Sequence, residues 1–282
     1  MYTENKILLC PNCKNTLTVV DKDKCYRCSN GHSFDIARQG YVNLLTSNQK
    51  KSKLPGDSNE MVLSRRDFLS KGYYQPVSNG INVLLLEGVK DKQLLVLDIG
   101  CGEGYYLNRM IVAAETTGIS VNGYGLDISK DAVKHGASSN KTVTWLVASS
   151  FNIPMESNGF DRIISVFSPV SGPECARLLK DDGLFVRVLP GLNHLMEIRQ
   201  IIYPEVLENE NPDAAKTIEG LQCIGVQPVN YTIVLDGLDL NTLVKMTPHY
   251  WKTRQADKAA LDGISRLSVT VDMQLCVFRK DV

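Results

Sequence analysis

Val96-Leu97-Asp98-Ile99-Gly100-Cys101-Gly102-Glu103-Gly104 is the stretch that decides the fold of this 282-residue chain. A continuous apolar run, Leu94–Leu97, leads into it, and apolar residues at helical spacing follow it: Leu107, Met110, Ile111 and Ala114. A strand, a glycine-rich turn and an amphipathic helix in this order indicate a βαβ unit. Because the apolar run does not alternate with polar residues, the strand is expected to be buried on both faces of a parallel sheet.

Strand-like runs continue to alternate with helical segments along the rest of the chain. Further strands are expected at Gly123–Leu126, Val143–Val147, Arg162–Phe167, Leu184–Leu189, Val229–Leu235 and Leu267–Phe278. The last of these alternates strictly between apolar and polar residues, which suits an antiparallel strand added late to the sheet. The sequence therefore predicts an α/β fold with a doubly wound, Rossmann-like sheet.

The chemistry of the glycine turn indicates the kind of ligand. Glycine lacks a Cβ, so Gly100, Gly102 and Gly104 allow the backbone to turn tightly and to approach a ligand closely. The spacing G-x-G-x-G differs from the G-x-G-x-x-G of pyrophosphate-binding folds, and the carboxylate of Asp98 would repel a diphosphate. Such a carboxylate suits a cation instead. S-adenosylmethionine, which carries an ammonium and a sulfonium and no phosphate, fits this pattern.

Two further strand ends belong to the same expected cofactor site. Asp127 ends the second strand, where a carboxylate can accept hydrogen bonds from both ribose hydroxyls. Ser149 ends the third strand, near the expected place of the adenine ring, and fits an ordinary turn equally well. The alternatives are a dinucleotide-binding oxidoreductase and a purely structural turn. Two carboxylates in the expected order favour S-adenosylmethionine over both.

Four of the eight cysteines lie within the first 28 residues. Cys10-x2-Cys13, Cys25-x2-Cys28 and His32 supply five potential ligands for a zinc ion that takes four. A site of four cysteines and a site of three cysteines with the histidine are therefore both open. Without a secretion signal, this clustering indicates a metal site rather than disulfides. A site closed entirely by protein ligands is typical of structural zinc.

Charge and hydropathy bear on partners and location. The chain has 31 Lys and Arg and 31 Asp and Glu residues, so its net charge gives no reason to expect nucleic-acid binding. One stretch is locally basic, with Lys50, Lys51, Lys53, Arg65, Arg66 and Lys71. It suits either a phosphate-binding face or a solvated connector. No apolar run approaches the roughly 18 residues of a membrane span, and we expect a cytoplasmic protein with no membrane partner.

Several motifs together resemble a known family. They are Cys10-Pro11-x-Cys13, Cys28-x3-His32-x-Phe34-Asp35, Gly40-Tyr41-Val42-Asn43-Leu44-Leu45, Pro55-Gly56-Asp57-Ser58, the glycine turn with Tyr105-Tyr106, Pro190-Gly191-x2-His194-Leu195 and Met246-Thr247-Pro248. In this combination the sequence resembles the bacterial 23S ribosomal RNA (guanine-N1) methyltransferases over nearly its whole length. The resemblance implies a class I methyltransferase domain that transfers a methyl group from S-adenosylmethionine to N1 of a guanine in a hairpin loop of 23S rRNA.

Composition and periodicity along the chain predict its organisation, and the resemblance implies RNA recognition by the first module and a set of site residues. Residues 1–35 would be a small zinc-binding module that recognises RNA, residues 36–90 a connector with helices at Met61–Lys71 and Val77–Leu86, and residues 91–282 the methyltransferase domain. Zinc would be held by Cys10, Cys13, Cys28 and His32, leaving Cys25 as the extra thiol. Tyr74 and His194 would line the cofactor pocket. The full expected cofactor-binding set is Tyr74, Asp98, Gly100, Gly102, Glu103, Gly104, Asp127, Ser149 and His194.

No residue identifies itself as a catalytic base. Methyl transfer to a ring nitrogen requires alignment of the reactants and loss of the N1 proton, for which His194 and Asp161 are the candidates. For His194, a contact with the cofactor or simple packing is an equal alternative. Phe167-Ser168-Pro169-Val170 follows the fourth strand, where many methyltransferases contact the target base, and lacks the Asn/Asp-Pro-Pro-Tyr pattern of amino-group methylation.

Two other functions compete with rRNA methylation. One is a class I methyltransferase that acts on another RNA or on a small molecule. The other is a non-catalytic, zinc-containing RNA-binding protein, against which the intact set of Asp98, Asp127 and the three glycines speaks. The sequence does not determine the oligomeric state, and a homodimer is compatible with it.

Overall fold

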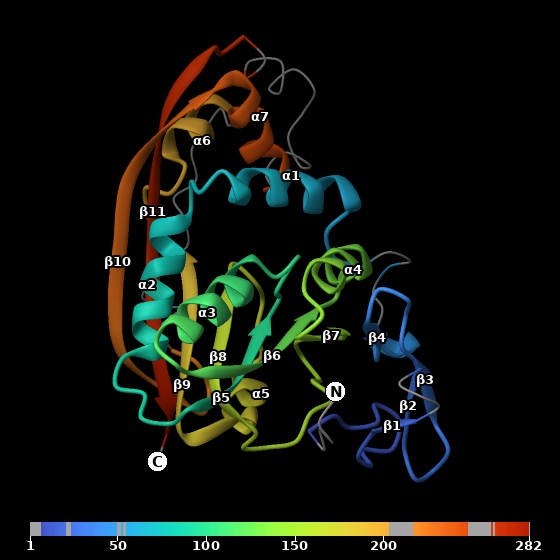
Figure 1. Ribbon diagram of the computed structural model, residues 1–282. Coiled ribbons are helices and arrows are strands. Elements are labelled where there is room, and N and C mark those ends of the chain that lie inside the picture. The colour runs from blue at the N-terminus through green and yellow to red at the C-terminus, as the bar shows by residue number, and fades with distance from the viewer. Residues whose placement is uncertain are drawn as a thin grey trace.

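An eight-stranded sheet forms the centre of the computed structural model, which describes residues 7–20, 24–49, 52, 55–202, 217–247, 261 and 263–281 (Figure 1). The order of the strands is β10-β11-β9-β8-β5-β6-β7-β4. All pairs between β4 and β9 are parallel, whereas β11 runs antiparallel to both of its neighbours. In chain order the strands are β4 (Tyr41–Asn43), β5 (Gln93–Ile99), β6 (Ser120–Asp127), β7 (Thr144–Val147), β8 (Phe160–Val166), β9 (Leu179–Pro190), β10 (Leu221–Asp236) and β11 (Arg266–Lys280).

The strands expected from Leu94 onward are confirmed, including the antiparallel strand near the C-terminus. The run Leu94–Leu97 lies in β5, which has strand neighbours on both sides, β6 and β8. The chain order reverses at this point, because β6 and β7 lie to one side of β5 and β8 and β9 to the other. In open α/β sheets such a switch point opens a crevice at the carboxyl ends of the strands, where ligands bind.

Helices cover both faces of the sheet. Val96 packs into a core shared with α2 and α3, whereas its neighbour Leu97 packs into the second core, on the opposite face, together with α5. This arrangement buries β5 on both faces, as its apolar run predicted. The helices are α1 (Asn59–Ser70), α2 (Gln75–Leu86), α3 (Tyr105–Thr116), α4 (Lys130–Ser139), α5 (Gly172–Leu178), α6 (Met196–Ile202) and α7 (Gly237–Lys245), with a 3-10 turn at Ser47–Gln49. None of them has the length and apolar character that a membrane crossing requires, among the residues described.

The N-terminal region begins with a small antiparallel sheet of three strands, β1 (Thr18–Val20), β2 (Cys25–Arg27) and β3 (Ser33–Asp35). It is attached to the main body by backbone hydrogen bonds. Leu9 N–H donates to Pro154 C=O over 2.8 Å, and Leu8 forms a bridge with Met155. The module is therefore packed beside the loop that follows β7.

The segment 36–90 is more than the connector that the sequence suggested. Tyr41 and Val42 are buried, and β4 extends the main sheet by pairing in parallel with β7. Helix α2 packs on α3 and on β9 and β11, while α1 packs on α7. A three-residue strand is too short to show periodicity, so only the tertiary pairing reveals its place.

Trp145 fills the space beneath the glycine turn. Its indole is 1% exposed, and a Cβ on Gly104, Gly125 or Gly136 would lie only 2.2–2.6 Å from the nearest ring atom. These glycines come from the turn, from β6 and from α4. One aromatic side chain in β7 thus fixes how close three elements of the cofactor region can approach.

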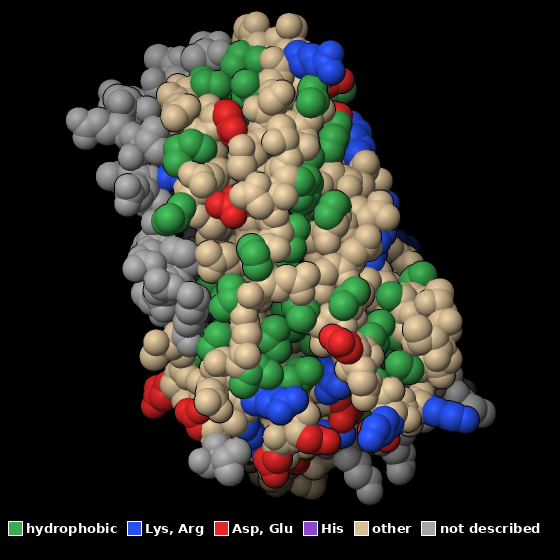
Figure 2. All heavy atoms as spheres, turned by 90° about the vertical axis from the view of Figure 1, so that its left-hand side faces the viewer, with side chains coloured by type: hydrophobic (Ala, Val, Ile, Leu, Met, Phe, Trp, Pro, Cys, Tyr) green, Lys and Arg blue, Asp and Glu red, His purple; other side chains and the backbone are tan. Residues whose placement is uncertain are grey.

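The edge strand β10 leaves apolar side chains in solvent. Ile224, Val226 and Val234 are exposed by 38–46%, and Figure 2 shows apolar and uncharged side chains over the middle of this face, with charged side chains gathered towards its lower end. An edge of this length carries unpaired backbone groups and is a natural place for association.

We predict that Gly136→Ala lowers the melting temperature by about 2–8 °C, since overpacking against Trp145 costs about 1–3 kcal/mol. Alanine gains up to about 1 kcal/mol of helix propensity in α4, which the clash outweighs. Gly225→Ala is the control, because nothing lies within 4 Å of its added Cβ. If calorimetry gave Gly136→Ala a melting temperature equal to or above that of the unaltered protein, the indole of Trp145 would be able to move and accommodate the added methyl group.

Candidate functional site

The glycine turn adopts a backbone that side chains rarely tolerate. The φ angles of Gly100, Gly102 and Gly104 are +74°, +56° and +89°. The N–H groups of Gly100 and Cys101 donate to Leu126 C=O over 2.7 and 3.0 Å, which ties the turn to the end of β6. A Cβ on Gly100 would lie 2.0 Å from Ser168 Oγ. The turn therefore needs glycine for both its conformation and its close packing.

Asp98 places a buried carboxyl group at the end of β5. The residue is 1% exposed, and its Oδ2 has no hydrogen-bond partner among the described residues. Burial, together with the negative charges of Asp127 and Glu103, raises the pKa of Asp98 to about 8. A backbone hydrogen bond from Leu107 to the carboxyl opposes this rise. A buried carboxyl with one unpaired oxygen and a perturbed pKa is typical of a ligand site. It fits a cation such as the ammonium of S-adenosylmethionine.

Asp127 lies one strand away with its carboxylate held in place. Gly102 N–H donates to Oδ2 over 2.9 Å and Ser129 N–H to Oδ1 over 2.8 Å. Burial raises the pKa of Asp127, although these two hydrogen bonds lower it. Ser149 follows on the next strand, where Ala148 N–H donates to Asp127 C=O over 3.0 Å. The two expected strand ends are thus side by side, at the edge where ribose and adenine would bind.

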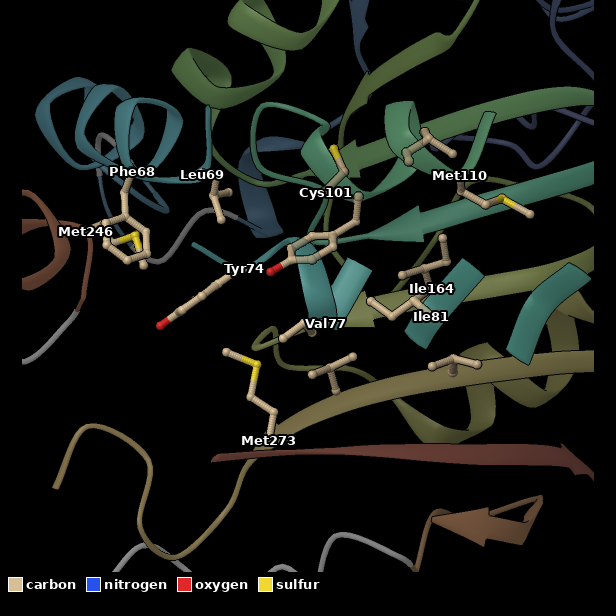
Figure 3. Close-up of a cluster of buried hydrophobic side chains, with 14 of the residues drawn as sticks. Phe68, Leu69, Tyr74, Val77, Ile81, Cys101, Met110, Ile164, Met246 and Met273 are labelled. Carbon is tan, nitrogen blue, oxygen red and sulfur yellow. The ribbon is translucent and has the colours of Figure 1, made fainter. Parts of the chain in front are cut away.

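A row of aromatic rings continues the site from the fourth strand. Phe167, which follows β8, is 43% exposed and stacks on His194 with ring centroids 5.5 Å apart. The ring centroids of His194 and Tyr74 are 6.3 Å apart. Figure 3 shows Tyr74 in the apolar cluster, with Phe68 and Met246 to one side and Val77 and Met273 to the other. Phe167 also has a φ of +54°, a strained value for a bulky residue and a feature that concentrates at functional sites.

The structure places the two candidate bases, His194 and Asp161, at different ends of the sheet. His194 is 9% exposed and lies in the site, but its Nδ1 accepts the N–H of Asp272 over 3.3 Å. In the neutral ring the proton then lies on Nε2, and the lone pair that a base needs is already engaged. The arrangement suits a contact role better than proton abstraction.

Asp161 is in the wrong place for catalysis. It is the second residue of β8, where it accepts the Leu95 N–H over 2.8 Å and pairs with Lys180 over 2.7 Å. This is the amino end of the parallel strands, opposite to the glycine turn. Its candidacy as a base is therefore withdrawn.

Helix α1 supplies site residues that the sequence assigned to a basic surface. It lies beyond the carboxyl ends of the central strands (Figure 1), and Arg65 forms an ion pair with Asp57 while its Nη2 donates to Met246 C=O over 3.0 Å. A Cβ on Gly102 would be 3.8 Å from Arg65 Nη1. Arg65 thus lies against the glycine turn. The one hint in the sequence was that the expected cofactor site contained three acids, Asp98, Glu103 and Asp127, and no lysine or arginine to balance them.

The rest of the basic stretch also changes meaning. Lys71 forms an ion pair with Asp239 on α7, and this bond dominates the raised pKa of the lysine. The ammonium group of Lys71 is therefore already paired within the protein. Lys50, Lys51 and Lys53 lie outside the described residues. Arg66 is exposed and keeps the surface position that was expected.

Four metal-ligating side chains meet at the N-terminus. The ligand atoms of Cys10, Cys13, Cys28 and His32 all lie within 4.8 Å of one another. The sulfur atoms of Cys13 and Cys28 are 3.7 Å apart, and His32 Nδ1 is 3.5 Å from Cys10 Sγ and 3.4 Å from Cys28 Sγ. Tetrahedral zinc, with Zn–S near 2.3 Å and Zn–N near 2.0–2.1 Å, separates neighbouring ligand atoms by about 3.5–3.8 Å. The cluster fits zinc, and Cys25 is not part of it.

Comparisons with known proteins match both parts of the chain. A family model described as "RlmA, N-terminal" matches residues 8–53, and one described as "Methyltransferase domain" matches residues 96–183. The 23S rRNA (guanine(748)-N(1))-methyltransferase of Streptomyces fradiae is 30% identical over 96% of each chain. The "Putative 23S rRNA (guanine-N(1)-)-methyltransferase YxjB" of Bacillus subtilis is 29% identical over 96% of each chain. S-adenosylmethionine and zinc are the cofactors that these domains imply, and the chain belongs to the 23S rRNA (guanine-N1) methyltransferase family.

Proposed function

We propose that the protein transfers a methyl group from S-adenosylmethionine to N1 of a guanine in a hairpin loop of 23S rRNA. The observation that carries the proposal is the buried carboxyl of Asp98, with its unpaired Oδ2, at a glycine turn that packs against Ser168, the sequence neighbour of the exposed Phe167. A site for a cationic cofactor would then lie near a surface that suits a guanine base. Family membership supplies the substrate, and mapping of the product decides which guanine is modified.

The cofactor-binding roles follow from the position of each group. Asp98 binds the ammonium, Asp127 the ribose hydroxyls, and Ser149 lies at the adenine. Gly100, Gly102 and Gly104 give room for close approach, while Tyr74, Glu103 and His194 line the pocket. When bound, S-adenosylmethionine supplies an electrophilic methyl group on a sulfonium. Methyl transfer would form the N–C bond as the C–S bond of the sulfonium breaks, with S-adenosylhomocysteine as the leaving group and the N1 proton released to solvent.

Phe167 is the proposed surface for the target base. RNA loops are read by bases that unstack and lie against aromatic side chains, and a methyltransferase must extract its base from any stack. Phe167 is exposed, its ring is backed by His194, and the adjacent Ser168 reaches Gly100. A guanine on this ring would therefore lie beside the glycine turn.

The zinc module is the proposed second contact with RNA. A hollow of about 670 Å³ on its surface is lined by Lys14, Asn15, Thr16, Thr18, Val20, Arg27, Cys28 and Ser29. Cations and hydroxyls of this kind suit a phosphate backbone. Lys14 Nζ also donates to Asn152, in the loop after Ser149, over 2.9 Å, so the hollow adjoins the methyltransferase site.

With rRNA as its substrate, the protein would act in the cytoplasm. A homodimer also stays a prediction, which light scattering can test.

The reaction is tested with unmodified 23S rRNA, tRNA and small metabolites as alternative acceptors of a tritiated methyl group. We expect incorporation into 23S rRNA alone. A methyl on N1 blocks the pairing edge of guanine, so reverse transcription should stop beside a single guanine in a hairpin loop. Incorporation elsewhere, or into no acceptor, would remove the proposal.

Within the same assay, Phe167→Ala should lower kcat/KM about 10- to 100-fold, the usual loss on removing a stacked base partner. The control is Leu238→Ala, which truncates an exposed apolar side chain on α7, and its kcat/KM should be unchanged. An unchanged kcat/KM for Phe167→Ala would exclude this ring as the base surface.

Binding of S-adenosylmethionine at pH 7 should release up to about one proton. The carboxyl of Asp98 carries a proton at this pH, because its pKa is about 8. A neighbouring ammonium favours the ionised form and lowers this pKa, so the proton leaves on binding. Titration calorimetry in phosphate and in Tris, which differ in ionisation enthalpy, measures the number released.

Asp98→Asn should abolish most of this release and weaken binding about 10- to 100-fold. Asp181→Asn, at a carboxylate 89% exposed, is the control and should behave like the unaltered protein. Proton uptake, or the same release after Asp98→Asn, would contradict the ammonium contact.

Metal analysis separates the two ligand sets. The purified protein should contain about one zinc per chain, and Cys28→Ser should lose most of it. Cys25→Ser removes an equally buried thiol outside the cluster and should keep the metal. Loss of zinc from Cys25→Ser would instead indicate a site made of four cysteines.

A further inference from the structure

Arg65 is a partly buried cation with spare hydrogen-bonding capacity at the cofactor site. Its side chain is 28% exposed, and its Nη1 is close to the backbone of Gly102. Two of its five N–H groups are used by the bonds to Asp57 and to the carbonyl of Met246. No described residue accepts a hydrogen bond from its Nε. The guanidinium can therefore take a further anionic partner without losing its present ones.

The segment around Arg65 is fixed to the end of β6. Ser129 Oγ donates to Asp57 C=O over 2.8 Å, and a Cβ on Gly56 would lie 2.9 Å from Ile128 and from Ser129. Asp57, the partner of Arg65, is thereby attached to the residues that follow Asp127. The cation and the expected ribose-binding carboxylate thus share one support.

The charges of the pocket leave one part of the cofactor unmatched. Asp127 and Glu103, and Asp98 once a bound ammonium has ionised it, are acids that suit cationic or hydroxyl groups and repel a carboxylate. S-adenosylmethionine nevertheless carries a carboxylate on the same carbon atom as its ammonium. Burial raises the pKa of Glu103, and the positive charges of Arg66 and Arg65 oppose this rise. Arg65 also counteracts the raised pKa of Asp127. Among the described residues, these two arginines are the cations whose charges reach the acids of the pocket.

Between the two arginines, the geometry selects Arg65. Arg66 is exposed at the surface of α1, whereas Arg65 is held against the glycine turn by its bonds to Asp57 and Met246. A guanidinium binds a carboxylate through two parallel N–H bonds, the strongest form of this contact.

We propose that Arg65 binds the carboxylate of the methionine moiety of S-adenosylmethionine, while Asp57 positions its guanidinium. The inference rests on the proposed function, because it requires that cofactor. It assigns to the segment 36–90 a part of the cofactor site that the glycine turn does not provide. The amino-acid end of the cofactor is then bound between Asp98 and Arg65, with its opposite charges matched.

The test compares S-adenosylmethionine with decarboxylated S-adenosylmethionine, which keeps the ammonium and the sulfonium and lacks only the carboxylate. Titration calorimetry gives both affinities for the full-length protein, for Arg65→Gln and for Arg66→Gln. The unaltered protein should prefer S-adenosylmethionine about 10- to 100-fold, the usual value of a charge-assisted pair. In Arg65→Gln this preference should fall to within about threefold, while decarboxylated S-adenosylmethionine binds as before. Arg66→Gln, which removes the same charge one residue away, should keep the full preference.

Each other outcome has a distinct meaning. A full preference in Arg65→Gln would overturn the inference, since the carboxylate would then have another partner. Equal weakening of both ligands would also overturn it, because Arg65 would only order the segment around the pocket. Absence of binding of either ligand to the unaltered protein would refute the proposed function itself. Arg65→Lys keeps the charge without the two-pronged geometry and should retain an intermediate preference.

Discussion

The buried carboxyl of Asp98 constrains the whole carboxyl edge of the sheet. A polar group that is buried without a partner costs about 1–3 kcal/mol of stability, and more if it is charged. A ligand that brings an ammonium to the unpaired Oδ2 of Asp98 would remove this cost and convert an internal penalty into binding free energy. The three glycines that follow permit this, because their left-handed backbone lets the turn approach Ser168, Trp145 and Arg65 closely.

Segments far apart in the chain complete the site around this carboxyl. The strands provide Asp127 and Ser149 at their ends, but the opposite side comes from α1, from the start of α2 and from the loop that holds His194. The region between the zinc module and the first strand of the methyltransferase domain is therefore packed against the proposed cofactor site. The same region joins the main sheet through β4 and adjoins the zinc module through β3.

The chemistry of the site depends on alignment more than on a strong base. Phe167 holds a strained backbone conformation, and His194 supports its ring while accepting a backbone hydrogen bond. Rigid groups of this kind suit an in-line displacement, in which the main task of the protein is to hold two reactants at the correct distance. Asp161 lies at the amino end of the sheet, where it forms an ion pair with Lys180.

Spacing along the chain was sufficient to predict the βαβ architecture, the glycine turn, the carboxylates Asp98 and Asp127 and the presence of a metal cluster. These features depend on local periodicity and on the rule that parallel strands end at one edge. Two other features required more than spacing. Spacing left both Cys25 and His32 open as zinc ligands; the family resemblance indicated Cys10, Cys13, Cys28 and His32, and the folding of three short strands brings these four together without Cys25. The place of Arg65 depends on Asp57, on the turn at Ser129 and on Met246, which is 181 residues away. Asp161, in contrast, directly precedes the strand expected at Arg162–Phe167, so the rule that parallel strands end at one edge already assigns it to the amino end of the sheet, remote from the glycine turn.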